Sequence, residues 1–458
     1  MSRSRTSGGR AIARTHITGA GIAATTATIL FALLWLVLPA TQSQLGYANL
    51  RLGVLLLAPP LVAFAHQLTH REVDVLSPWI LLPLTTWLTF AAGPTVLLAS
   101  NQPAEAELLV DTLSIGALSY FLGVFTSLNW ARQRRRPTSV PPVSRRAILI
   151  PFAVGACAMA WYWARAGGIP AIGPDSETAR IAALTGSGIP FYLSMLLMVS
   201  VWIMAAGRSD LPRPIQLSLA FVAVVLLAST GWRNVPFALL AVSLLLLFYR
   251  RVVSLRTLIL GVVMAVVGAV GFGIYRAVSS GITHYETSKL ALNGQYGAAI
   301  WVYLRDYTAT FSRNLVDVVQ LAERSVPEWG ETFVWNILAL MPGSDREPFD
   351  LVLKQRLGLG FQGGGLPPTM MGELLLNFGQ VGLIIGMFLI GILASRVHGM
   401  LSSSSMAARI VAALTLYFMV SAIRGGIGNV LFNVLWLSLA TVAILAILSP
   451  ETSERVKR

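Results

Sequence analysis

The chain has 458 residues, of which 55% are hydrophobic and only 12% are charged, whereas soluble globular domains contain about 25% charged residues. This composition excludes an ordinary soluble protein and indicates a protein that crosses a membrane several times. The formal net charge of +14 does not require a nucleic-acid partner, because much of it lies in short segments beside apolar runs, as the positive-inside rule expects. The lone Cys157 excludes an intrachain disulfide and a cysteine-based metal site.

Apolar runs long enough to cross about 30 Å of hydrocarbon recur along most of the chain. About twelve membrane-spanning helices are predicted from this length criterion, at residues 17–38, 51–66, 78–100, 108–130, 147–164, 188–206, 214–230, 236–249, 257–276, 368–394, 407–423 and 427–448. The first run is too long for a typical signal peptide and is predicted to be retained. The expected fold class is therefore an all-α integral membrane protein with no internal repeat of the whole chain.

Arginines predict the orientation of these spans. The densest cluster is the proline-rich linker at 132–146, and further arginines mark alternate short loops, which the positive-inside rule places in the cytoplasm. Both termini are then cytoplasmic. The predicted regions are nine spans in 1–276, an external loop at 277–367, three spans in 368–448, and a cytoplasmic tail at 449–458.

The external loop is expected to be partly helical rather than a flexible linker. Residues 296–322 place apolar side chains at helical spacing opposite charged ones, which predicts an amphipathic helix on the membrane surface. A second helix is predicted at 328–340, ending at Met341-Pro342-Gly343 because proline and glycine terminate helices.

The stretch 361–382 carries an ionisable residue at the start of a predicted span. Its glycines at 363–365 allow a tight turn, and the prolines that follow predict a helix beginning near Pro368. The polar residues of this helix share one face, namely Thr369, Glu373, Asn377 and Gln380. A charge costs about 2.5 to 3.5 kcal/mol at the centre of a membrane helix and less near its end. Glu373 is therefore a candidate functional residue; the alternative is that it only caps a helix or pairs with an arginine.

Eight arginines fall on the predicted outer side, against the positive-inside tendency: Arg180, Arg233, Arg276, Arg305, Arg313, Arg346, Arg356 and Arg424. An anionic partner would explain them, since a guanidinium matches phosphate through two parallel hydrogen bonds. For Arg305, Arg313 and Arg356, pairing with nearby carboxylates or lipid phosphates is the preferred interpretation. For Arg233 and Arg424, which lie in tight turns, a ligand role is preferred.

Two weaker signals also lie on the outer side. Asp175-Ser-Glu177 has a carboxylate spacing that can hold a divalent ion, although neutralisation of Arg180 is the preferred interpretation. His284 can act as a general base, but a single surface histidine is more often uninvolved. No P-loop, zinc signature or nucleophile elbow is present, so neither a metal nor a cofactor is predicted.

Residues 364–382 read Gly-Gly-Leu-Pro-Pro-Thr-Met-Met-Gly-Glu-Leu-Leu-Leu-Asn-Phe-Gly-Gln-Val-Gly. This run resembles the signature of the oligosaccharide repeat unit polymerases, the Wzy-type O-antigen and capsule polymerases. Looser similarities lie in the loop at 167–180, in Ser229-Thr-Gly-Trp-Arg233, and in Ala339-Leu-Met-Pro342. A second outer carboxylate motif could not be aligned, which leaves the catalytic base open.

The resemblance implies a glycosyltransferase that moves a growing glycan from one polyprenyl pyrophosphate to a sugar hydroxyl of another lipid-linked repeat unit. It implies a site on the outer face of the cytoplasmic membrane, with chain-length regulator and flippase proteins as partners and no nucleic acid. The candidate residues are then Glu373, His284 and Asp175 for catalysis; Arg180, Arg233, Arg346 and Arg424 for the pyrophosphate; and Asn377, Gly364, Gly365 and Thr369 for substrate positioning.

Two other functions remain open at this stage. A ligase that transfers lipid-linked glycan to a different acceptor would share the site. A transporter or flippase would place polar residues near the membrane midplane and usually shows two similar halves.

Overall fold

The computed structural model describes residues 53, 55–61, 63, 74, 77–128, 141–172, 187–232, 234–280, 285–339, 346–359 and 365–449. Within 262–286 the side chains of several residues, Arg276 among them, lie outside this description. The described chain is helical except for turns and one short parallel pairing of β1 (Pro142–Val143) with β2 (Arg208–Ser209). The predicted all-α, multi-pass membrane protein is confirmed.

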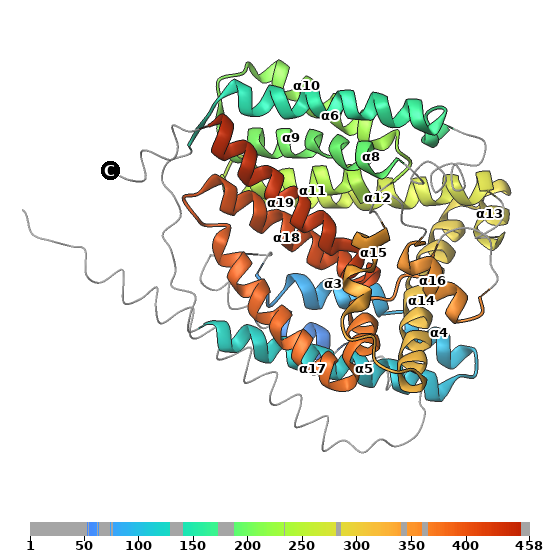
Figure 1. The fold of residues 1–458 in the computed structure, drawn as a ribbon. Coiled ribbons are helices and arrows are strands. Elements are labelled where there is room, and N and C mark those ends of the chain that lie inside the picture. The colour runs from blue at the N-terminus through green and yellow to red at the C-terminus, as the bar shows by residue number, and fades with distance from the viewer. Residues whose placement is uncertain are drawn as a thin grey trace, which may run out of the picture.

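Figure 1 shows a bundle in which most helices run side by side, with a smaller group lying across one end. The first part comprises α3 (Leu81–Phe90), α4 (Gly93–Ala99), α5 (Pro103–Leu128), α6 (Arg145–Ala166), η1 (Pro170–Ile172), α8 (Gly188–Ser194), α9 (Leu196–Ala206), α10 (Arg213–Ala228), α11 (Asn234–Tyr249) and α12 (Leu255–Ser280). Next come α13 (Tyr285–Leu292), α14 (Tyr296–Arg324), α15 (Glu331–Ala339) and α16 (Phe349–Arg356). The chain then forms α17 (Met370–Met400), α18 (Met406–Gly425) and α19 (Gly428–Leu448).

Seven helical segments of the described chain are long and apolar enough to cross a membrane, namely Leu81–Ala99, Pro103–Ser127, Arg145–Ala166, Gly188–Ala206, Met370–Met400, Met406–Gly425 and Gly428–Leu448. The helices α10 and α11 are apolar but shorter, and α12 occupies the predicted ninth span. The predicted span at 17–38 lies outside the described residues, and 51–66 is only partly described. The total of twelve therefore stays a prediction.

Several boundaries differ from those predicted. The segments predicted as single spans at 78–100 and 188–206 each remain one candidate span, Leu81–Ala99 and Gly188–Ala206, but each consists of two short helices, α3 with α4 and α8 with α9. Between the ninth and tenth predicted spans, the described residues form four helices instead of the predicted two, because α13 and α16 flank the predicted pair. Their apolar positions are few, so the pattern of the sequence alone did not distinguish them from turns.

The helix α14 runs transverse to the long helices of the bundle, across the end that also carries α15 and α16 (Figure 1). It occupies the segment predicted to be amphipathic. Phe311, Leu315 and Val318 are buried against the bundle, whereas Ile300 and Trp301, nearer its start, are exposed. Trp is enriched at membrane–water interfaces, so the exposed Trp301 is suited to a contact of α14 with the membrane surface.

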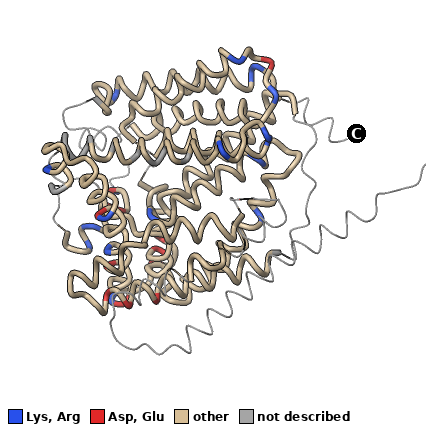
Figure 2. Tube along the Cα trace, turned by 180° about the vertical axis from the view of Figure 1, so that it is seen from behind, with Lys and Arg blue, Asp and Glu red and all other residues tan. Residues whose placement is uncertain are grey.

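Acidic residues are unevenly distributed between the two ends of the molecule. Most Asp and Glu residues of the described chain gather at the end with α14 to α16, mixed with arginines, while the opposite end carries mainly Lys and Arg (Figure 2). The positive-inside rule counts Lys and Arg and gives little weight to Asp and Glu, so the outward position of 277–367 stays a prediction.

Glycines allow α5 and α17 to pack with their backbones in contact. A Cβ atom at Gly123 would lie 1.9 Å from the carbonyl oxygen of Phe388, and one at Gly391 would lie 2.2 Å from the carbonyl oxygen of Tyr120. Small residues at such positions are the usual means of close helix packing in membranes. The contact fixes α17, which carries Glu373, against α5.

We expect Gly123→Ala to separate α5 from α17 and to destabilise the protein by about 1 to 3 kcal/mol, the usual cost of overpacking. The measurement is the melting temperature of the purified protein in detergent. The matched control is Gly268→Ala on α12, where an added Cβ meets nothing within 4 Å. Equal melting temperatures for the two variants would contradict the proposed packing role.

Candidate functional site

The start of α17 is set by Thr369 rather than by Pro368. Thr369 is the N-cap residue, and its hydroxyl accepts a hydrogen bond from the backbone N–H of Gly372 at 3.1 Å. Its backbone has φ 61° and ψ 159°, a conformation that costs a β-branched residue energy and that recurs at functional sites. The helix therefore begins at Met370, two residues after the predicted start near Pro368, and Thr369 is buried as its cap.

The Glu373 side chain is 1% exposed, and hydrogen bonds from two other parts of the chain reach its carboxylate. The Thr332 hydroxyl donates to Oε1 at 2.8 Å. The backbone N–H of Gly428 lies 3.0 Å from Oε2 and 3.2 Å from Oε1, and the N–H of Ile427 also donates to Oε2. Glu373 therefore caps the N-terminus of α19, where free N–H groups and the helix dipole favour a negative charge.

Asn377 continues this network one turn further along α17. Its Nδ2 donates to the Thr332 hydroxyl at 2.6 Å and to the Glu373 carbonyl at 2.8 Å, and its Oδ1 accepts from the Gly330 N–H at 2.8 Å. Asn377 and Thr332 are both fully buried. The amide thus fastens the segment before α15 to α17.

The helix α17 is broken at Gly379, whose φ of 64° and ψ of −158° are not helical. The break frees carbonyl groups of the preceding turn. The Leu376 and Asn377 carbonyls accept instead from the backbone N–H groups of Glu328 and Trp329, each at 3.0 Å. Gln380, predicted to share the polar face of Thr369, Glu373 and Asn377, lies beyond the break and is exposed, whereas the other three are buried.

Two glycines let the turn between α18 and α19 approach this carboxylate. A Cβ at Gly426, where φ is 86°, would lie 2.7 Å from Glu373 Oε2. A Cβ at Gly428 would lie 2.7 Å from Oε1 and 2.5 Å from the Thr332 carbonyl oxygen. Glycine is required at both positions for the turn to close around Glu373.

A second link joins α15, α16 and α19. Asn336 Nδ2 donates to Asn429 Oδ1, and Asn336 Oδ1 accepts from the backbone N–H of Phe349 at 3.0 Å. Sequence analysis missed Thr332 and Asn336. The available signal was their spacing of four residues, which puts two small polar side chains on one face of an otherwise apolar helix.

The arginines at the end of the molecule that carries α14 to α16 differ in the groups that they contact. Arg305 pairs with Asp306 at 2.9 Å, and Arg356 pairs with Glu328. Arg346 lies 3.6 Å from Glu331 and stacks over the Trp335 ring. These contacts agree with the preferred interpretation of Arg305 and Arg356, and they show that Arg346 is already engaged within the protein.

Arg313 also has a nearby carboxylate. Burial raises the pKa of Asp317 above its ordinary value, the neighbouring Glu105 raises it further, and the positive charge of Arg313 opposes both effects. The charge of Arg313 is therefore partly offset by the carboxyl group of Asp317.

Arg424 differs from these arginines. It is exposed at the end of α18, and its Nη1 donates to the hydroxyl of Tyr307 on α14. Within the described ranges, no carboxylate forms an ion pair with it.

Other predicted site residues cannot be placed. Asp175, Arg180, Arg233, His284 and Gly364 lie outside the described residues. Gly365 is described and packs against α16: a Cβ there would lie 2.5 Å from Asp350 Cβ.

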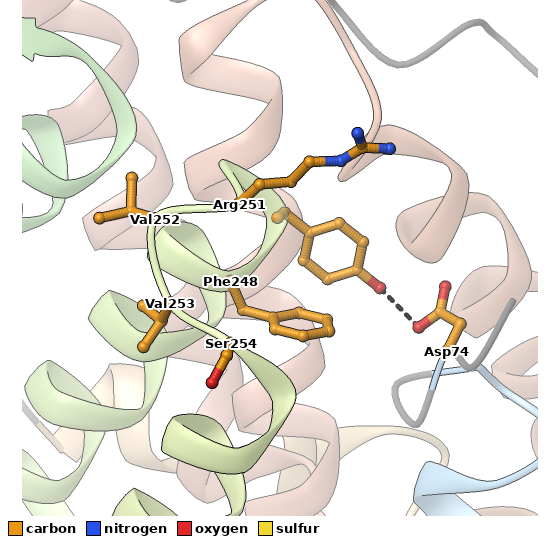
Figure 3. A pocket seen from close by; sticks show the side chains of 7 residues that line it. Asp74, Phe248, Arg251, Val252, Val253 and Ser254 are labelled. Carbon is orange, nitrogen blue, oxygen red and sulfur yellow. Dashed lines mark hydrogen bonds between the residues drawn. The ribbon is translucent and has the colours of Figure 1, made fainter. Parts of the chain in front are cut away.

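A hollow of about 420 Å³ lies at the opposite end of α17, where sequence analysis predicted no site (Figure 3). It is lined by Asp74, by the last two residues of α11 and by residues 251–254 of the turn that follows. The Tyr249 hydroxyl donates to Asp74 Oδ1 at 2.9 Å, and Asp74 Oδ2 lies 2.9 Å from His398 Nε2. These bonds attach the C-terminal end of α17 to α11.

Residues 74–294 match the family described as "Putative O-antigen polymerase". This region of the chain is therefore similar to the O-antigen polymerase family. It covers just under half of the chain and includes the loop at 167–180 and the run Ser229 to Arg233, two of the segments that carry the resemblance. No curated protein and no solved structure matches the chain.

The matched family supports the polymerisation of repeat units and a role in polysaccharide biosynthesis. The signature at 364–382 lies outside the matched region. Its connection to that region is structural, because α17 packs along α5.

We expect Glu373→Gln to be inserted in the membrane but to lose most activity. Glutamine keeps one acceptor oxygen for the N–H groups of Ile427 and Gly428, but it removes the negative charge, whose interaction with the start of a helix contributes about 0.3 to 1 kcal/mol and up to about 2 kcal/mol when partly buried. The melting temperature and the length of the polymer made in cells are the measurements.

The control is Gln380→Ala, an exposed position of the same helix beyond its break. If Glu373→Gln matched this control in both measurements, the carboxylate would be neither a necessary cap nor a catalytic group.

Proposed function

We propose that the protein joins polyprenyl-pyrophosphate-linked oligosaccharide repeat units into a surface polysaccharide on the outer face of the cytoplasmic membrane. The observation that carries the proposal is Arg424, an exposed guanidinium without a carboxylate partner in the described structure. It lies in the last turn of α18, directly before the segment whose N–H groups at Ile427 and Gly428 donate to Glu373; residues 424–428 are called the Arg424 turn below. The family match at 74–294 supports the same reaction class.

The reaction breaks the bond between the anomeric carbon of the donor glycan and its pyrophosphate oxygen, and forms a bond from that carbon to an acceptor hydroxyl oxygen. Negative charge grows on the departing pyrophosphate. A preorganised guanidinium stabilises this charge, because its donors need no reorganisation at the moment of transfer. Arg424, together with Arg233 and Arg180, is proposed for this role.

The acceptor hydroxyl must also lose a proton. Glu373, predicted as a catalytic residue, has both oxygens occupied by donors of the protein and is almost fully buried. We therefore propose that Glu373 positions the Arg424 turn. The proton acceptor is then sought at His284 or Asp175.

Arg346, Thr369, Asn377 and the glycines at 364–365 were predicted to contact the substrate. Of these, Asn377 and Thr369 are buried in the network around Glu373. Their contribution is proposed to be indirect, through the shape of the outer end of α17.

The ligase alternative keeps the same donor chemistry and changes only the acceptor. A deletion strain distinguishes a polymerase from a ligase. The lipid-linked glycans that accumulate in it are identified by mass spectrometry. Single repeat units on lipid are the result expected for a polymerase, whereas full-length unattached glycan would indicate a ligase. Transport, the third function considered, predicts repeat units that accumulate on the inner leaflet.

We expect Arg233→Lys and Arg424→Lys each to reduce polymerisation by tenfold or more, because lysine keeps the charge but loses the two-pronged match to phosphate, and a hydrogen bond to a charged group contributes about 1.5 to 3 kcal/mol. Polymer length and the amount of protein in the membrane are measured together. Arg305→Lys is the matched control, since Arg305 already pairs with Asp306. Wild-type polymer from both lysine variants, at normal protein levels, would remove the pyrophosphate role.

The proposed reaction requires that the segment 277–367 face outside. A topology reporter fused at Gly330 is expected to be active only on the outer side, and one fused at Arg251, in the turn between α11 and α12, only in the cytoplasm. The reverse pattern would place the Arg424 turn on the wrong side of the membrane for a surface polymer.

A further inference from the structure

The hydroxyl of Tyr307 is the acceptor that the structure gives to Arg424. A neutral hydroxyl orients a guanidinium without cancelling its charge, whereas a carboxylate would do both. Guanidinium has five N–H donors in a fixed plane, so a single bond to Tyr307 leaves most of them for an anion. The Tyr307 hydroxyl thus orients the Arg424 guanidinium and leaves its charge and most of its donors for an anion.

The Tyr307 ring is itself held firmly. It belongs to a row of aromatic residues spaced four apart on α14, with its centroid 6.0 Å from that of Tyr303 in a stacked arrangement and 4.8 Å from that of Phe311 edge to face. Tyr303 in turn packs on α12, where a Cβ at Gly273 would lie 2.2 Å from the Tyr303 hydroxyl oxygen. The hydroxyl that meets Arg424 is therefore fixed by contacts on both sides.

A second tyrosine connects α18 to α11. Tyr417 lies seven residues before Arg424, on the same face of α18, and its hydroxyl donates to the carbonyl oxygen of Asn234 at 3.1 Å. Asn234 is the first residue of α11 and directly follows Arg233 in the sequence. The end of α18 is thus attached both to α14 and to the helix that starts beside Arg233.

We propose that Tyr307 is a positioning residue that orients Arg424 toward the diphosphate of the lipid-linked donor, so that the transverse helix α14 forms one wall of the diphosphate site. This inference rests on the proposed function, since it needs Arg424 to meet a diphosphate.

The test is a double-mutant cycle between Tyr307→Phe and Arg424→Ala, with donor and acceptor extracted from a deletion strain as lipid-linked repeat units. Phenylalanine keeps the ring contacts and removes only the hydroxyl. We expect Tyr307→Phe to lower kcat/KM about tenfold, mostly through a higher KM for the donor. The same substitution should have little further effect in the Arg424→Ala background, because residues that act through one another are non-additive.

The matched control is Tyr296→Phe, which removes a hydroxyl from an exposed side chain of the same helix and should leave kinetics unchanged. A second measurement uses inorganic pyrophosphate as the probe. It should raise the melting temperature of the wild type and of Tyr296→Phe, raise that of Tyr307→Phe less, and leave that of Arg424→Ala unchanged.

The outcomes distinguish the pyrophosphate role of Arg424 from the positioning role of Tyr307. If Arg424→Ala polymerises normally, the proposed function itself fails. If Arg424→Ala is impaired but Tyr307→Phe behaves as the wild type, or if its loss is equally large in both backgrounds, the positioning role is wrong while the pyrophosphate role of Arg424 stands.

Discussion

The buried carboxylate of Glu373 is the constraint on which this end of the protein depends. An ionised group without water must receive hydrogen bonds from the protein, or its burial costs several kcal/mol. Here the donors come from Thr332 at the start of α15 and from the first N–H groups at α19. One side chain therefore sets the positions of three chain segments that are distant in sequence, and the glycines at 426 and 428 are what allow it to come so close.

The break in α17 at Gly379 complements this constraint. Carbonyl groups released within a membrane helix need partners, because hydrocarbon supplies none. The segment before α15 provides them through the N–H groups of Glu328 and Trp329. The loop thus stabilises an irregular helix, and the irregular helix in turn fixes the loop against the bundle. The Asn377 side chain belongs to both sets of contacts.

The arginines of the same end illustrate how the surroundings of a charge decide its availability. Arg305 and Arg356 have carboxylate partners, and such exposed pairs contribute little to stability but reduce the positive potential. Arg424 has a hydroxyl partner and keeps its charge. Since a polymerising transfer expels a pyrophosphate, the useful cation is the one whose field the protein leaves uncancelled.

The sequence by itself determined the class of the protein. A membrane-spanning helix is predicted from the length and composition of one apolar segment, without any knowledge of its neighbours. It also identified Glu373 and Arg424, since ionisable residues at span ends and in tight turns stand out without any knowledge of their neighbours. Only the tertiary structure decided what these residues contact. That Glu373 caps α19, that Thr332 joins it, and that Tyr307 meets Arg424 all depend on contacts between segments 40 to more than 100 residues apart, and no local pattern encodes such pairings.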